Sequence, residues 1–176
     1  MQTLEAIAKR KSTRDFDPDK AVPEEIVDTI VKAGCQAPIG GNDRKSLHLT
    51  VCRNREILDE INQSTAAAMK MEPRDFFYGA PVVIIVSSSE KQMAPGIECA
   101  NTACVIENML IAATDAGLGN IYLWGGVQGL AKNKELCAKM GIPEGFKPVS
   151  AAAIGYRKSG EAQPRELSVS ISANYI

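Results

Sequence analysis

The residues best suited to chemistry lie close together near the start of the sequence. Residues 9–16 read Lys-Arg-Lys-Ser-Thr-Arg-Asp-Phe, in which the hydroxyl of Ser12 is flanked by four cations: Lys9, Arg10, Lys11 and Arg14. Apolar residues recur at helical spacing just before this segment, and the negative end of a helix dipole stabilises cations. The same cluster also suits an anion, because a phosphate accepts several charged hydrogen bonds at once. The segment by itself leaves both interpretations open, a helix end or an anion clamp.

Composition restricts the function classes that remain. The 176 residues fit a single domain, 1–176, that is large enough to bury a core. With 20 basic residues, 21 acidic residues and a net charge of −1, the chain lacks the positive excess of a general nucleic-acid binder. No apolar run reaches the length of a membrane span, and the first residues do not form an apolar signal region. We therefore expect a cytoplasmic protein with neither a nucleic-acid nor a membrane partner.

Side chains for conventional catalysis are scarce. The one histidine, His48, lies in an expected strand, and we favour a structural role for it over a catalytic one. The five cysteines are scattered without a C-x-x-C pair, which together with a single histidine argues against a zinc site. The Gly117-Leu118-Gly119 segment follows an expected helix and lacks the third glycine of a dinucleotide-binding motif. We expect no metal site and no catalytic side chain, so a cofactor would carry the chemistry.

Hydrophobic periodicity and turn residues predict helices and strands that are interspersed along the chain. The expected helices cover residues 3–8, 23–34, 55–70, 97–116 and 128–139, and the expected strands cover 47–52, 81–86, 120–124 and 149–154. The helix at 97–116 is apolar around most of its circumference, which predicts a central and buried position. The mixture of elements indicates one α+β or α/β domain.

Six pieces of the sequence, in the same order, resemble the FMN-dependent nitroreductase family. Residues 10–16 match the family's opening R-[RHK]-S-x-[RK]-x-[FY], and residues 80–84 match its strand A-P-V-V-I. Residues 37–42 read A-P-I-G-G-N and are similar to its loop A-P-S-x-x-N, and residues 108–119, N-M-L-I-A-A…G-L-G, are similar to its central helix N-M-x-L-A-A…G-L-G. Residues 124–126 lie where the family has its glycine loop facing the flavin, and Ile154-Gly155-Tyr156 followed by Arg165 resembles its C-terminal signature. The resemblance implies an α+β fold: a three-layer α-β-α sandwich whose central, mostly antiparallel sheet is flanked by helices.

The resemblance implies FMN as the cofactor and assigns its polar end to basic residues. Arg10, Lys11 and Ser12 match family positions that hold the phosphate and ribityl oxygens. Arg165 matches a second phosphate-binding arginine, so charge from both ends of the chain would converge on one anion. Arg14 matches a basic position nearer the ribityl and pyrimidine end, where a cation favours flavin reduction.

The resemblance assigns the flavin ring to two other segments. Trp124, Gly125 and Gly126 match the loop beside the ring near N5, where glycine allows the backbone to approach closely. The ring is also contacted from the other subunit, at family positions that correspond here to Pro38, Ile39, Gly40 and Asn42.

The resemblance also implies a partner and a reaction. Family members are intertwined homodimers with two sites at the interface, so the helix at 97–116 would bury surface against its twin; a core helix of a monomer is the alternative. NADH or NADPH would pass hydride to flavin N5, leave, and be replaced by an acceptor such as a nitroaromatic or a quinone. This ping-pong scheme requires no acid or base from the protein.

Three departures from the family pattern affect these expectations. The loop continuation N-x-Q-P-W is replaced by residues 42–47, which lack the aromatic side chain but offer Arg44 and Lys45 to a phosphate or acidic substrate. The basic position before the A-P-V-V-I strand is matched by Arg74, although Asp75 aligns there as an alternative. Only about ten residues, Ser87 to Pro95, connect that strand to the central helix, so we expect an open pocket or a roof from elsewhere. Two alternatives therefore stay open: an FMN storage or sensor protein, and a relative specialised in flavin fragmentation or reductive dehalogenation.

Overall fold

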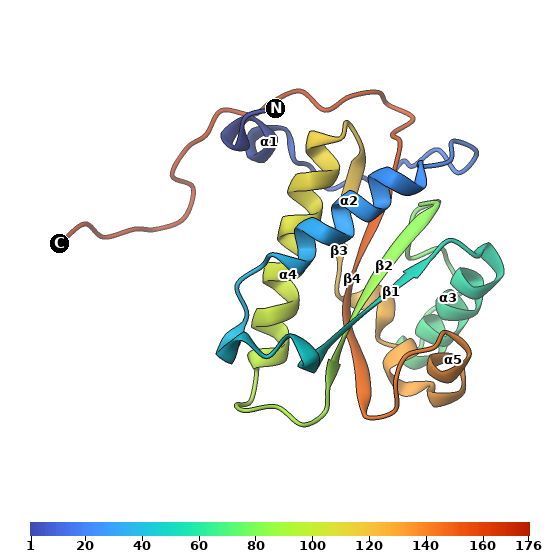
Figure 1. Cartoon of the computed structure of the whole chain (residues 1–176). Helices are drawn as coiled ribbons and strands as arrows, with labels where there is room; N and C mark the ends of the chain where they lie inside the picture. Colours follow the sequence, from blue (N-terminus) through green and yellow to red (C-terminus); the bar gives the residue numbers. More distant parts are fainter.

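The computed structural model describes all 176 residues, which form three layers around one β-sheet (Figure 1). The four strands lie in the order β1-β2-β4-β3, and every neighbouring pair is antiparallel. The strands are β1 (Leu47–Cys52), β2 (Val82–Ser89), β3 (Gly119–Leu123) and β4 (Phe146–Gly155). The helices are α1 (Thr3–Lys9), α2 (Glu24–Cys35), α3 (Arg55–Met69), α4 (Ile97–Asp115) and α5 (Lys134–Lys139). The expected α-β-α arrangement with an antiparallel sheet is confirmed.

The two central strands, β2 and β4, are apolar on both faces. Val82–Val86 of β2 is fully buried, and small residues of β4 lie opposite, so that Val83 pairs with Ala153 and Ile85 with Ala151. β-Branched side chains fit such a pleated surface well. β3 is an outer strand that pairs with β4 through one edge. At its other edge a single bridge joins Asn120 to Ser12.

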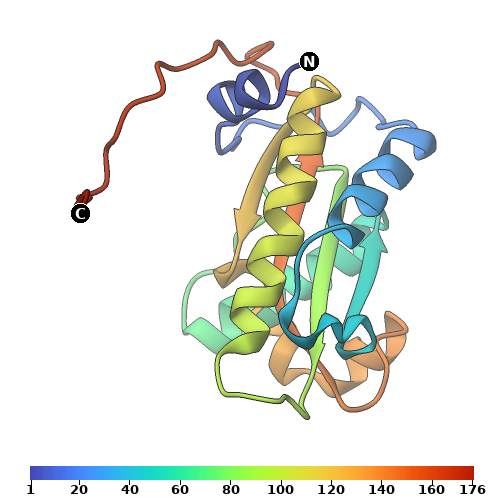
Figure 2. The ribbon, with the colours of Figure 1, turned by 60° about the vertical axis from the view of Figure 1, so that its left-hand side comes forward.

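Helices cover both faces of this sheet. Helices α2 and α4 pack side by side on one face, where Ile30 and Ile106 meet β2 residues such as Ile84 (Figure 2). Helices α3 and α5 cover the other face, where Leu58 and Leu136 lie in the second core. Both layers follow from the period-two alternation of β2, which sends successive apolar side chains to opposite faces.

The expected helix at 128–139 is the one element that the prediction placed wrongly. Two short 3-10 turns, Gly125–Val127 and Leu130–Lys132, precede the six-residue α5. Asn133 separates the second turn from α5, because its backbone is extended and its side-chain oxygen accepts a 3.0 Å hydrogen bond from the amide of Leu136. That bond is an N-cap, which starts a new helix instead of continuing an old one.

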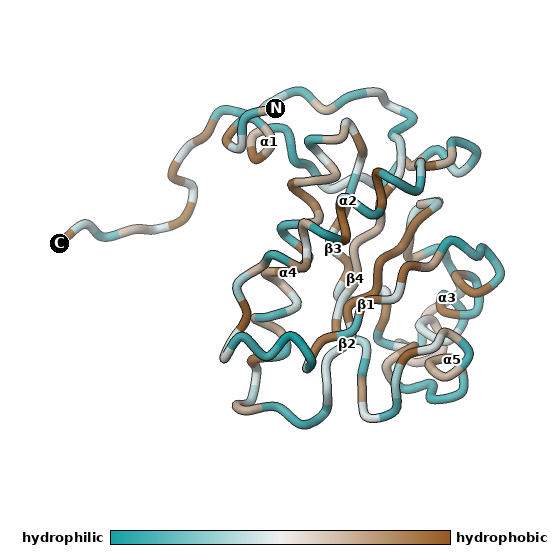
Figure 3. Tube along the Cα trace, viewed as in Figure 1, coloured by the Kyte–Doolittle hydropathy of each residue, from teal (hydrophilic) through white to brown (hydrophobic).

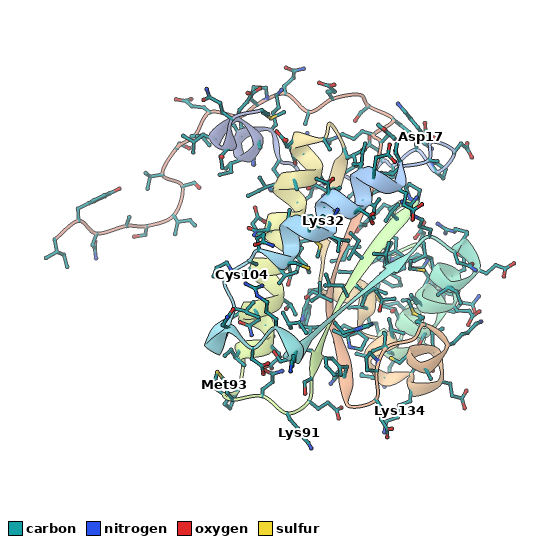
Figure 4. All side chains as sticks on the ribbon, viewed as in Figure 1. Asp17, Lys32, Lys91, Met93, Cys104 and Lys134 are labelled. Atoms are coloured by element: carbon teal, nitrogen blue, oxygen red, sulfur yellow. The ribbon has the colours of Figure 1, made fainter.

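The burial of α4 differs from the expectation of a helix surrounded by protein. Its inner side, with Ile106 and Met109, is fully buried, whereas Ala100, Ala103 and Cys104 are exposed in the single chain. Cys104 is marked on this outer side in Figure 4. The apolar circumference of α4 is therefore only partly used within one chain.

The C-terminal segment from residue 158 has no regular structure. It passes over α1 and then leaves the body of the protein (Figures 1 and 3). Leu167, Val169 and Ile171 of this tail are 55%, 74% and 82% exposed, respectively. None of the helices combines the length and hydropathy that a membrane crossing requires.

Candidate functional site

The basic segment is fastened to the outer edge of β3. Ser12 forms a parallel bridge with Asn120, and the amide of Thr13 donates to the Asn120 carbonyl oxygen at 2.9 Å. Thr13 is fully buried, whereas Arg14 is exposed. Because successive side chains of an extended segment point to opposite sides, Ser12 and Arg14 face away from the core. The edge of β3 thus presents a hydroxyl and a guanidinium on one side.

Arg165 joins this segment from the far end of the chain. Its backbone amide donates to the carbonyl of Ala8 at 3.0 Å, and its Nη2 donates to the carbonyl of Arg10 at 2.9 Å. A guanidinium carries five N–H donors, so the remaining ones stay available to a ligand. The fold thus brings the Arg165 side chain to the backbone of Arg10, and their joint binding of a phosphate stays a prediction.

The other end of β3 leads into the glycine turn at residues 124–126. A Cβ added to Gly125 would meet no atom within 4 Å, and the φ angle of this residue is not positive. Neither backbone strain nor crowding thus requires glycine there, and its effect is to leave an open surface beside the exposed Trp124. Gly126 is buried, and its carbonyl accepts a 3.0 Å bond from Thr65 Oγ1 that fixes the turn.

A turn at residues 74–79 places two cations next to this edge. The carboxylate of Asp75 accepts hydrogen bonds at 2.8 Å from the amides of Phe77 and Gly79. Arg74 is exposed and lies 4.7 Å from the ring centroid of Phe76, while Arg14 lies 5.8 Å from that of Tyr78. The turn therefore connects the position of Arg74 with that of Arg14.

Asp75 itself is committed to the fold. Burial alone would raise the pKa of Asp75, but the amides of Phe77 and Gly79, the Arg55 guanidinium and the Asn62 amide outweigh it and hold that pKa below its usual value. Arg55 Nη2 and Asn62 Nδ2 lie 3.2 Å and 3.1 Å from its oxygens. Of the two residues that the sequence left open, Arg74 is the one free to meet a ligand.

The loop at residues 38–42 lies far from the basic segment. It is fastened to the start of α4, where the amide of Gly40 donates to Asn101 Oδ1 at 2.9 Å. The basic segment lies near the other end of this helix, and 19 helical residues span about 28 Å. The loop also leads into β1, at the opposite edge of the sheet from β3 (Figure 1). One chain does not bring Pro38, Ile39, Gly40 and Asn42 to Arg10.

Lys11 lies on a different side of the segment from Ser12. It borders a small polar hollow of about 30 Å³, together with Asn120, Arg157 and Glu161. The buried Oδ1 of Asn120 and Nε of Arg157 have no hydrogen-bond partner within the chain. The sequence interpretation missed Thr13, Asn120 and Arg157, although a polar residue opening an apolar strand was a signal for Asn120.

Two other polar residues that the sequence singled out serve the fold. The guanidinium of Arg44 donates to the carbonyl oxygens of Cys35 and Ala37, at the end of α2. Cations stabilise this negative end of a helix. The ring of His48 meets that of Phe146 edge-on, with centroids 6.2 Å apart, in agreement with a structural role. Lys45 remains exposed and without such contacts.

Comparison with known proteins identifies the family. The model of the nitroreductase family matches residues 7–156, and the chain belongs to this family. A relative from Methanothermobacter thermautotrophicus, provisionally named NADH dehydrogenase/NAD(P)H nitroreductase, is 34% identical over 158 residues, which are 89% of this chain and 78% of the relative.

Solved structures support the same assignment. A nitroreductase with bound FMN from Bacteroides fragilis superposes with a TM-score of 0.79 at 26% identity, covering 100% of this chain and 99% of that one. A second FMN-bound nitroreductase, from Desulfitobacterium hafniense, shares the fold with a TM-score of 0.84 at 24% identity, again over 100% and 99% of the two chains.

Proposed function

We propose that this protein is an FMN-dependent NAD(P)H oxidoreductase that reduces small organic acceptors such as nitroaromatics or quinones. One observation carries the proposal: Arg10, Ser12 and Arg165 meet at one end of outer strand β3, and the open surface of Gly125 lies at its other end. The five residues of β3 span about 14 Å at the usual strand rise. A phosphate, an extended ribityl chain and a flavin ring can cover that length when placed end to end.

The basic end of this edge fits a phosphate. Arg10 and Arg165 provide two guanidinium groups, and Ser12 provides a hydroxyl between them and β3. Guanidinium groups bind phosphate oxygens in a bidentate manner, which fixes orientation as well as adding affinity. A phosphate would therefore suit this end of the edge better than a neutral group.

The glycine end fits a flat ring. The surface beside Gly125 is one that a Cβ would fill, and Trp124 next to it is 61% exposed. FMN held along this edge would supply the redox chemistry, hydride transfer between NAD(P)H and the acceptor. Arg14 and Arg74 would stabilise negative charge on the cofactor from the side of the 74–79 turn.

A second copy of the chain would complete the proposed site. The 38–42 loop leads into β1, at the opposite edge of the sheet from β3, so its proposed contact with the cofactor would come from another subunit. The outer side of α4 exposes Ala100, Ala103 and Cys104, which are small enough for close helix packing. The exposed apolar residues of the tail would also gain a partner surface.

The direct test is the visible spectrum of the purified protein. We expect a yellow protein, or one that turns yellow with added FMN, whose flavin absorbance bleaches anaerobically with NADH or NADPH and returns when a quinone is added. Bound flavin that never bleaches with either nucleotide would support a storage or sensor protein instead. Failure to bind FMN at all would refute the proposal.

A further inference from the structure

We propose that Thr13, held by Asn120, is a positioning residue that sets the phosphate-binding segment on β3 and so determines the preference for FMN over riboflavin. Riboflavin is the same flavin without the phosphate. The inference rests on the proposed function, because it needs Arg10, Ser12 and Arg165 to hold a phosphate. It adds a residue that lies on the opposite side of the segment from any ligand.

Thr13 and Asn120 are joined by reciprocal hydrogen bonds. The backbone amide of Thr13 donates to the backbone carbonyl of Asn120 at 2.9 Å, and the backbone amide of Asn120 donates to Thr13 Oγ1 at 3.2 Å. The hydroxyl in turn donates to the carbonyl of Lys11 at 3.4 Å. Thr13 is 0% and Asn120 1% exposed, so water cannot replace a lost partner without cost.

The side chain of Asn120 extends this network to α4. Its Nδ2 donates to the Leu110 carbonyl at 3.1 Å and to Thr114 Oγ1 at 2.8 Å. The Leu110 carbonyl can only accept, which fixes the orientation of the amide. The segment is therefore tied through Asn120 to the last turns of the longest helix in the protein.

Close packing against the backbone of β3 leaves the Thr13 side chain little room to move. A Cβ at Gly119 would lie only 2.8 Å from Thr13 Oγ1 and 2.9 Å from its Cγ2, so Thr13 sits directly on the strand backbone. Ser12 precedes it in the chain, and Arg10 lies two residues further back. A displacement of Thr13 thus moves the groups proposed to bind phosphate, and binding geometry tolerates shifts of only about 0.5 Å.

The sequence alone gave no reason to single out Thr13. Its position is the variable one in the opening motif, and a threonine before an arginine is an ordinary surface pattern. Only the fold shows that its hydroxyl accepts a hydrogen bond from the backbone amide of Asn120, 107 residues away in the chain.

The test compares Thr13→Val, which keeps the shape and removes the hydroxyl, with Thr13→Ser, which keeps the hydroxyl. FMN and riboflavin affinities are measured by flavin fluorescence, well below the melting temperature of each apoprotein. For Thr13→Val we expect FMN binding about tenfold weaker, riboflavin binding changed less than about twofold, and for Thr13→Ser an FMN affinity within about threefold of wild type.

Asn120→Ser provides an independent variant, should Thr13→Val fail to fold. It removes the amide bonds to α4 while keeping the backbone pairing with Thr13, so we expect about threefold weaker FMN binding with riboflavin unaffected. Equal losses for both flavins in these variants would show a merely structural role and overturn the inference.

Two outcomes separate this inference from the function on which it rests. Wild-type protein that binds no FMN refutes the proposed function and the inference with it. Wild-type protein that prefers FMN, beside a folded Thr13→Val with the same preference, overturns the inference alone.

Discussion

Arg165 Nη2 donates a 2.9 Å hydrogen bond to the carbonyl oxygen of Arg10, although 155 residues separate the two in the chain. The contact uses the backbone of Arg10, so its side chain is left for other partners. The bond keeps the Arg165 guanidinium beside the backbone of the basic segment, and its other N–H groups stay available to a ligand. Both arginines are therefore free to bind one anionic ligand, which is the role that the proposed function gives them.

Replacing either arginine tests that shared ligand. We expect Arg10→Ala and Arg165→Ala each to weaken FMN binding by about 1–3 kcal/mol, because each removes charged hydrogen bonds to the phosphate. The double variant should lose less than the sum, since coupled residues are not additive. Titration calorimetry measures all three affinities.

Glu166→Ala is the matched control for these variants, because Glu166 is the exposed neighbour of Arg165 and has no place in the proposed site. It should bind FMN like the wild type. An unchanged FMN affinity in Arg10→Ala would contradict the phosphate assignment.

Gly125→Ala tests the open surface at the end of β3. Since a Cβ there meets no protein atom, we expect the stability of the apoprotein to change by less than about 0.5 kcal/mol. The methyl group would displace the flavin ring, and we expect NAD(P)H-dependent turnover to fall at least about tenfold. Thermal melting and steady-state rates report the two effects separately.

Gly129→Ala, four residues further on, is the contrasting variant, because it should lower the stability of the apoprotein. A Cβ there would lie 2.2 Å from the backbone of Ser64 and Thr65, so overpacking should destabilise the apoprotein by about 3 kcal/mol. If Gly125→Ala showed wild-type turnover, the flavin ring could not lie on the surface beside Gly125.

Asp75 should make the protein sensitive to acid. Its pKa is lowered in the folded state, so the unfolded chain binds more protons as the pH falls, and stability is lost below about pH 4. Asp75→Asn should lose about 2 kcal/mol at neutral pH, because an amide nitrogen cannot accept the hydrogen bonds that one carboxylate oxygen accepts from Gly79 and Arg55, and it should show a flatter acid limb. Urea unfolding between pH 3 and pH 7 measures both effects. If the free energy of unfolding fell in parallel with pH in the two proteins, Asp75 would contribute nothing to the acid sensitivity.

The outer side of α4 should form the subunit contact. Cys104→Arg places a long cation on this exposed surface, and we expect it to shift the protein from dimer toward monomer and to weaken FMN binding (Figure 4). Lys32→Glu on α2 changes an exposed charge outside this surface and should leave the dimer intact. Sedimentation velocity distinguishes the states, and a Cys104→Arg protein that remains dimeric would place the interface elsewhere.

The sequence by itself determined most of the elements and the chemical character of the site. The alternation in β1, the apolar run of β2 and the long α4 are local patterns, and residues 10–16 carried both the charge cluster and the resemblance to a family. Local patterns suffice here because the spacing of apolar residues a few positions apart records which face of a helix or strand is buried. The 128–139 segment failed because the N-cap at Asn133 looks, in sequence, like any polar helix residue.

The tertiary structure decided which of these residues can act together. It brought Arg165 to Arg10, committed Asp75 to the turn that leaves Arg74 free, and placed the 38–42 loop at the far end of α4. It also revealed that Thr13 is bonded to Asn120. These relationships depend on hydrogen bonds and packing between residues many tens of positions apart, and no local period in a sequence records such contacts.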